Sequence, residues 1–220
     1  MQFGLIGLQQ FKMQEKQWGG RYLYKSFQDQ HKFGSSADLA IHAKYAFSKK
    51  FSVDATIANG DGYKNLESDS LLKYSLGVTA VLAKGLDFRV YYDFMGSEDV
   101  QQSISFYLGY AKDGFKAGAE YNQQLNNKMT ADRDLTGLSF YASYKVNKTR
   151  FFGRYDHLSS NTLANATMPW NEGKDGSAFI AGVEFNPVKG IKITPNVQNW
   201  SPKDGSPSTF ITYVSCEIAF

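Results

Sequence analysis

The side chains suited to catalysis or metal binding are few in this chain of 220 residues. His31, His42 and His157 lie far apart, and Ser159 beside His157 is better explained by a hydroxyl-rich loop than by a catalytic triad. Cys216 is the only cysteine, which excludes an internal disulfide and a cysteine-based metal cluster. The sequence contains no Walker loop, no HExxH and no GxGxxG motif. It therefore predicts no enzyme, no cofactor and no metal centre.

One polar loop carries oxygen ligands of the kind that Ca²⁺ prefers. These are Asn59, Asp61, Glu67 and Asp69, but their spacing matches no known calcium-loop motif. We therefore expect a solvated loop at this position.

The charged segment with the clearest functional pattern spans residues 11–37. It holds five basic and two acidic residues, with six aromatic residues among them. A long loop of this composition is unlike a segment that moves freely in solvent. One interpretation is an inward-folded constriction that attracts anions, with Lys16, Arg21 and Lys25 as candidate contacts. The other interpretation is an extracellular cap packed on neighbouring loops.

The elements that must position these residues are strands, because apolar and polar residues alternate along most of the chain. From Leu39 to Phe47 every second residue is apolar, and the pattern resumes at Phe51. A period of two indicates a strand with one apolar face. We expect twelve strands, at 2–9, 38–48, 51–60, 71–83, 86–96, 103–112, 115–124, 136–146, 149–158, 177–186, 190–199 and 209–220. Most have the length of about 9–11 residues that a tilted membrane strand needs.

The connections between these strands alternate between short and long. Tight turns such as Lys84-Gly85 and Asp113-Gly114 alternate with polar stretches such as 125–135 and 159–176. Short turns at one rim and long loops at the other are typical of an outer-membrane barrel. The sequence therefore predicts an all-β fold, an antiparallel up-and-down transmembrane β-barrel of about twelve strands, formed by residues 1–220 as a single domain.

One face of the expected strands is apolar and carries no charged residue. Aromatic residues lie towards the strand ends on this face, and small residues such as Ala117 and Ala142 lie near the middle. Two aromatic girdles around an aliphatic band match the two interfaces of a membrane. The alternative is a soluble β-sandwich or a lipocalin-like barrel, but strand length, girdles and turn asymmetry favour the membrane barrel.

The opposite face carries eight basic and eight acidic residues, so we expect it to line the lumen. Candidate contacts for a solute on this wall are His42, Lys44, Arg89, Lys116, Glu120, Arg150 and Arg154. Charges of opposite sign across a passage create a transverse field for small hydrated solutes. Equally, paired wall charges can be salt bridges between strands.

Two features of the sequence resemble known outer-membrane proteins. The end of the last expected strand, Val214 to Phe220, has a terminal Phe with apolar residues at every second position before it, and so resembles the C-terminal strand of bacterial outer-membrane proteins. The stretches from Gly7 to Lys12 and from Trp18 to Asp38 resemble the middle of the phosphate-selective (O/P-type) porins. In that family a strand leads into a long loop that folds into the pore. The resemblance implies sixteen strands, of which this chain would supply the C-terminal part; a barrel of twelve strands is the alternative.

From these features we expect a porin of the bacterial outer membrane, a water-filled channel for passive diffusion of small solutes, anionic ones included. Its partners would be outer-membrane lipid and small hydrophilic solutes, with a homotrimer as one candidate assembly. A net charge of +3 is too small to indicate nucleic acid. The alternatives are a barrel enzyme that acts on lipids, and a plugged barrel that serves adhesion or complex formation.

Overall fold

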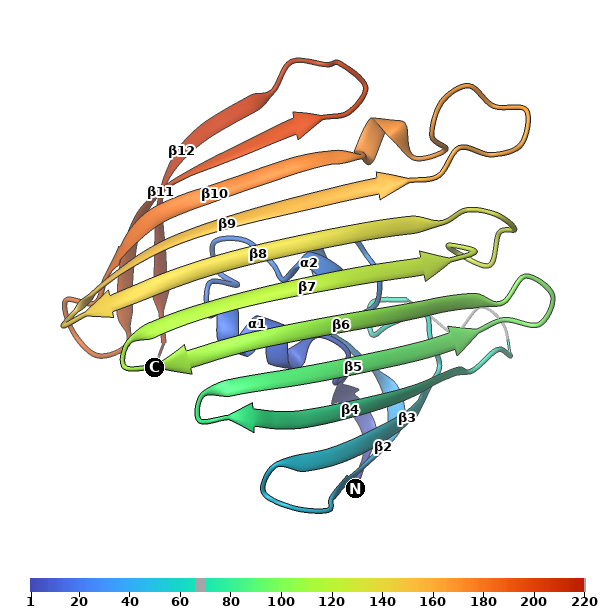
Figure 1. The fold of residues 1–220 in the computed structure, drawn as a ribbon, viewed down its shortest axis with the longest axis horizontal. Helices are drawn as coiled ribbons and strands as arrows, with labels where there is room; N and C mark the ends of the chain where they lie inside the picture. Colours follow the sequence, from blue (N-terminus) through green and yellow to red (C-terminus); the bar gives the residue numbers. More distant parts are fainter. Residues whose placement is uncertain (66–69, 220) are drawn as a thin grey trace.

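The computed structural model describes residues 1–65 and 70–219, and it is built almost entirely from strands (Figure 1). Glu67, Asp69 and Phe220, which the sequence analysis singled out, lie outside the described residues. The strands are β1 (Gln2–Gly7), β2 (Ala37–Ala46), β3 (Phe51–Ala58), β4 (Lys73–Ala83), β5 (Leu86–Met95), β6 (Gln101–Lys112), β7 (Phe115–Leu125), β8 (Leu135–Val146), β9 (Thr149–Ser160), β10 (Gly176–Phe185), β11 (Ile191–Pro202) and β12 (Thr209–Ile218). The helical elements are α1 (Lys12–Trp18), α2 (Phe27–Gln30) and the 3₁₀ turn η1 (Glu172–Lys174).

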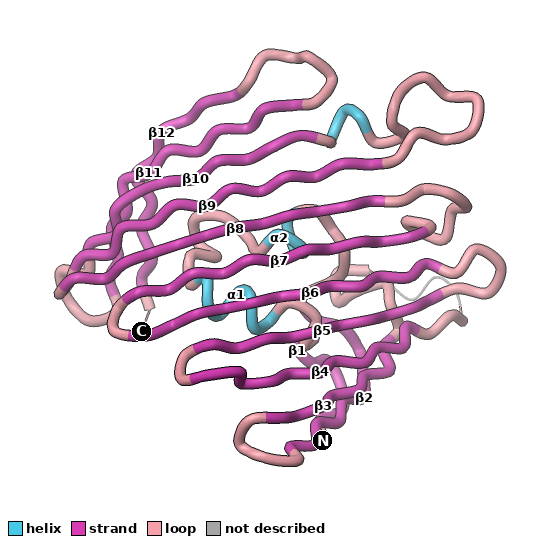
Figure 2. The backbone as a smooth tube through the Cα atoms, in the orientation of Figure 1, coloured by secondary structure: helices cyan, strands magenta, loops and turns pink. Residues whose placement is uncertain are grey.

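All twelve strands form one sheet in which each strand pairs with the next along the chain. The pairing is antiparallel at every step, so the predicted up-and-down order is confirmed. The sheet curls but does not close, because no pairing joins β1 to β12 among the described residues. The tube drawing shows these two strands at opposite edges of the curled sheet (Figure 2).

The turns of the sheet differ sharply between its two ends. Asp113 and Gly114 connect β6 to β7 with φ of 51° and 82°, the left-handed values of a two-residue hairpin. The connections at the opposite end are longer, and the one between β9 and β10 spans residues 161–175. Figure 1 shows the short turns together on the left and the long loops on the right. The predicted asymmetry of turns is therefore present.

The outer face of the sheet, which we define by Leu76, Phe140 and Phe179, exposes large apolar side chains. These three are 54%, 48% and 48% exposed. The inner face is the one that carries Arg89, Tyr141 and Ile180, all buried. Exposed apolar side chains on one face and buried polar ones on the other invert the arrangement of a soluble protein. This inversion suits a sheet whose outer face contacts lipid.

The segment between β1 and β2, residues 8–36, folds back over the inner face of the sheet. It contains α1 and α2, which contact β6, β7 and β8 and lie behind those strands in Figure 1. The sequence predicted a long loop here but not its helices. Within residues 1–65 and 70–219, no helix has the length and apolar character needed to cross a membrane.

Candidate functional site

The inner face holds segment 8–36 through arginines that rise from the sheet. Arg154 on β9 is 3% exposed. Its Nε and Nη2 donate to the two carboxylate oxygens of Asp156, at 2.8 and 2.6 Å. Its remaining Nη1 donates to the backbone carbonyl of Lys25, at 2.8 Å. The guanidinium also lies over the rings of Trp18 and Tyr24, at 5.2 and 5.4 Å. One buried cation thus neutralises a wall carboxylate and fixes the segment.

Arg150, four residues earlier on β9, makes a similar set of contacts. Its Nη2 lies 2.6 Å from Glu184 on β10, while its Nη1 donates to the carbonyl of Trp18 at 3.0 Å. Tyr22 of the segment donates to the same Glu184 carboxylate at 2.8 Å and lies 2.6 Å from the Thr194 hydroxyl. A bond to an ionised partner is stronger than a neutral one, so this region anchors α1 firmly.

Arg89 on β5 forms the third anchor. Both of its terminal nitrogens bond to the Asp54 carboxylate, at 2.7 and 2.9 Å, and Nη2 also donates to the Gln9 carbonyl at 3.3 Å. Beside it the buried Lys73 ammonium lies 2.7 Å from Asp93. The wall charges at these positions are therefore paired with each other, which agrees with the salt-bridge interpretation of the sequence.

Aromatic packing completes the attachment of α1. Trp18 is 1% exposed and meets Tyr141 and Phe152, with ring centroids 5.5 and 5.7 Å apart. The Trp18 indole N–H donates to the carbonyl of Tyr24 at 2.9 Å, so its polar atom is satisfied. The buried cluster around this ring consists of Trp18, Tyr107, Tyr141, Phe152, Ala178 and Ile180.

A second apolar cluster receives α2. Phe27 is fully buried against Phe33, Leu135 and Leu158. A Cβ on Gly137 of β8 would lie only 2.1 Å from the Phe27 ring. Glycine at this strand position therefore makes room for the aromatic side chain.

The face of the segment that points away from the wall is basic. Lys16, Arg21 and Lys25 are all exposed. Arg21 bridges Glu15 and Asp29 at 3.2 Å each, and Lys25 contacts Asp29 at 3.2 Å. Lys16 forms no ion pair with any described residue. Five bases against two acids give residues 11–37 the same excess as the net charge of +3 of the whole chain.

This basic face continues into a hollow of about 690 Å³ beside the long loops. Arg21, Lys25 and Asp29 line it from the segment, and Lys64 and Lys128 line it from the loops. Among the described residues that line the hollow, cations outnumber carboxylates, which favours anions there.

The remaining predicted contacts are spread along the sheet. His42 is buried and its Nδ1 lies 3.0 Å from the Thr56 hydroxyl. Lys44 is exposed and stands opposite Asp54 in the β2–β3 register. Lys116 is half-buried and Glu120 is buried on β7, the strand behind α1. These residues do not form one cluster, and their role as solute contacts stays a prediction.

Burial shifts the titration of groups on the segment. It lowers the pKa of His31 to about 4 because the charged imidazolium loses its hydration. It raises the pKa of Tyr24 to about 12, with Asp156 adding to the effect. Both side chains are therefore neutral at pH 7. The residues described form no group of three or more His, Cys, Asp or Glu that could hold a metal ion.

Sequence reasoning missed the apolar patch on the inner face. Phe152, Leu158 and Ile180 all point to the face that we expected to be polar. Their signal is a break in the alternation, such as the Phe151-Phe152 pair, where neighbouring residues on opposite faces are both aromatic. Such a break predicts that something apolar covers the inner wall.

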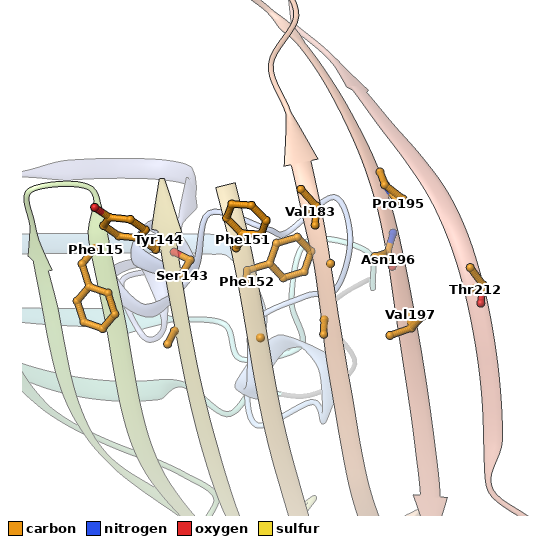
Figure 3. A pocket seen from close by; sticks show the side chains of 14 residues that line it. Phe115, Ser143, Tyr144, Phe151, Phe152, Val183, Pro195, Asn196, Val197 and Thr212 are labelled. Carbon is orange, nitrogen blue, oxygen red and sulfur yellow. The ribbon is translucent and has the colours of Figure 1, made fainter. Parts of the chain in front are cut away.

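The outer face has a hollow of about 670 Å³ near the short turns. Figure 3 shows Phe115, Tyr144 and Phe151 on neighbouring strands, with Pro195 and Thr212 further along the sheet. Small residues including Gly153 and Ala181 give the hollow its depth. It lies on the apolar outer face of the sheet.

No protein-family model and no curated protein matches the sequence. Solved structures do match. OmpTΔL8, a loop-deletion mutant of OmpT described as an outer-membrane protein of Vibrio cholerae, is 12% identical with a TM-score of 0.69. That match covers 98% of this chain and 74% of the other.

Two further matches are a porin, 11% identical with a TM-score of 0.63, and the outer-membrane channel DcaP of Acinetobacter baumannii, 13% identical with a TM-score of 0.59. They cover 83% and 82% of this chain, which spans only 62% and 60% of their lengths. The chain thus has the fold of the outer-membrane β-barrels, and the predicted fold class is confirmed. The identities are too low to carry more than the fold.

Proposed function

We propose that this protein is a porin of the bacterial outer membrane, which forms a water-filled channel for passive diffusion of small anionic solutes. The observation that carries the proposal is the fixed position of segment 8–36 on the inner face, with its cations pointing away from the wall. The wall arginines are neutralised by carboxylates, whereas residues 11–37 hold five bases against two acids and so supply a net positive charge. The outer face, apolar and aromatic, would contact lipid.

The segment would act as a constriction because charges in a narrow passage act more strongly than charges on a wide wall. Low-dielectric walls focus the field of Lys16, Arg21 and Lys25 into the remaining space. Solutes would first meet the basic hollow beside the long loops and then this face. Anions would therefore be concentrated before they pass.

Single-channel recording tests the proposal. Replacing Lys16, Arg21 and Lys25 by Glu should shift the reversal potential towards cations, most strongly at low salt where screening is weak. The matched control replaces Lys49, Lys84 and Lys189 by Glu, since these are exposed near the short turns. The control should shift the potential less. Equal shifts would show that the segment does not line the passage, and no conductance at all would favour the plugged barrel.

The finer resemblance to phosphate-selective porins gives a second readout. Under this proposal, phosphate should reduce the chloride current at millimolar concentration, and the loop triple variant should abolish the block. A homotrimer would be seen as three conductance steps per insertion and as a trimer mass in detergent. Block by phosphate that persists in the triple variant would move the anion contact away from the segment.

A lipid-acting enzyme is the second candidate, because one hydroxyl–imidazole pair lies on the outer face. His157 Nδ1 is 2.9 Å from the Ser177 hydroxyl, which also lies 3.0 Å from the Tyr155 hydroxyl. Within the described chain, no carboxylate is bonded to the other ring nitrogen, so the orienting group of a triad is missing. A phospholipase assay on the protein and its S177A variant decides: activity lost in S177A would establish the enzyme.

A further inference from the structure

A second cavity, of about 920 Å³, opens between segment 8–36 and the long loops. The segment contributes Tyr24 and His31, the β9–β10 connection contributes Trp170, and β11 contributes Trp200. Leu135 and Leu158, both buried, are among its lining residues, so part of the wall is apolar. Lys32 and Lys128 line both this cavity and the basic hollow described above.

The aromatic side chains of the cavity are held in place. His31 stacks obliquely on Phe27, at 4.5 Å between ring centroids, and lies 6.1 Å from the Trp200 ring. The Trp170 indole N–H donates to the Asp134 carbonyl at 3.0 Å. Fixed ring faces lose little entropy when a flat ligand packs against them.

The charged side chains of the cavity are all basic. Lys32, Lys128, Arg133 and Lys174 line it, and no Asp or Glu is among its described lining residues. None of the four forms a salt bridge within the described chain, and the Arg133 guanidinium lies 5.4 Å from the Trp170 ring. Four cations without ion pairs attract an anion, and the aromatic faces beside them can pack against a flat group.

One buried polar atom also lacks a partner here. The Nε2 atom of His31 is shielded from solvent and forms no hydrogen bond with any described residue. An unpaired buried polar atom is destabilising, so a shift of the His31 ring that brings Nε2 to a ligand oxygen or hydroxyl would favour binding.

We propose that this cavity binds a planar aromatic carboxylate at the outer end of the protein. The ring would pack on Trp170 or Trp200 and the carboxylate would face the lysines and Arg133. A neutral sugar fits less well, because it would leave the four cations without a counter-charge, although Gln30, Asn127 and Asn171 offer amide oxygens as acceptors. The site goes beyond the proposed channel, and it binds ligand whether or not the channel conducts.

Titration calorimetry of the protein folded in detergent tests this with benzoate, benzyl alcohol, cyclohexanecarboxylate and glucose. Benzoate should bind at least about threefold more tightly than each of the others, since only it combines a planar ring with charge. Trp200→Leu should weaken benzoate binding by about three- to tenfold. Trp170→Leu, in a loop outside the sheet, checks the result should the first variant fold poorly.

The cations are tested by K32Q/K174Q, with K203Q as the control for an exposed lysine outside the cavity. The double variant should weaken benzoate binding by about two- to fivefold at low salt, and the control should not change it. Benzyl alcohol or glucose binding as tightly as benzoate would overturn the proposal, as would no benzoate binding or full affinity in both tryptophan variants. Binding with no conductance would contradict only the channel.

Discussion

Three arginines of the inner wall and two lysines of segment 8–36 are placed in opposite ways. Arg89, Arg150 and Arg154 are buried, paired with carboxylates and bonded to backbone carbonyls of the segment. Lys16 and Lys32, on the segment, are exposed and form no ion pair with any described residue. The wall arginines thus hold the structure together, and under the proposed function the segment's cations would set the potential that a solute meets.

Removing one wall arginine should have the largest effect and tests whether these arginines hold the structure together. Arg154→Met leaves Asp156 as a buried, unpaired charge, which should destabilise the fold by about 3–5 kcal/mol. It should also free the segment near Lys25 and speed trypsin cleavage there. Heat-dependent gel mobility measures the first effect, and the cleavage rate measures the second.

The double variant R154M/D156N separates these two effects. Removing both charges should restore most of the lost stability, because a buried pair contributes little net energy. Cleavage at Lys25 should stay fast, since its carbonyl still lacks the arginine donor. If cleavage returned to the wild-type rate, Arg154 would not anchor the segment.

A smaller disturbance comes from the apolar side of the attachment. Gly137→Val would place a Cβ about 2 Å from the Phe27 ring, and such overpacking costs about 1–3 kcal/mol. We expect α2 to shift and the channel current to become noisier. Gly153→Val is the control, because a Cβ there meets nothing within 4 Å. Identical currents in the two variants would argue against packing of Phe27 on β8.

The mildest test uses pH. The pKa of His31 is lowered to about 4 by burial. Between pH 6.5 and 4 the imidazole is therefore protonated in the unfolded chain but neutral in the folded chain. Stability should therefore fall as pH decreases through this window, by about 1–3 kcal/mol, and this contribution should level off below pH 4. His31→Gln should show a flatter stability curve. Curves of equal slope would mean that His31 is not buried in solution.

The sheet could be predicted from the sequence because apolar and polar residues alternate within each strand. Apolar residues occupy every second position without interruption from Leu39 to Phe47 and from Phe115 to Tyr121. Turn-forming residues such as Asp113 and Gly114 mark the tight turns between strands. The strand ends were less accurate: β1 ends at Gly7 rather than at residue 9, and β11 continues to Pro202 rather than ending at 199. Backbone hydrogen bonds between neighbouring strands set these ends, and they can extend beyond the apolar residues or stop before them.

The attachment of the segment could be predicted only in part. Its charge and aromatic content indicated a folded element, but which arginine faces which carbonyl depends on how the sheet curls. Arg154 and Lys25 are 129 positions apart, and no local pattern links them. The cavity beside Trp170 and Trp200 escaped prediction for the same reason, since its walls come from four separate stretches of chain.

The order of events during assembly follows from the same separation. Neighbouring strands find each other across a few residues, whereas the Gln198 side chain bonds to the Leu23 carbonyl across 175 positions. Contacts of such span carry a larger loop-closure cost and form late. The segment precedes β6 to β11 in the sequence, but it can pack on the sheet only after these strands have paired. Under the proposed function, its cations would remain in water while the strands insert, and the channel would acquire their charge only in the last step of assembly.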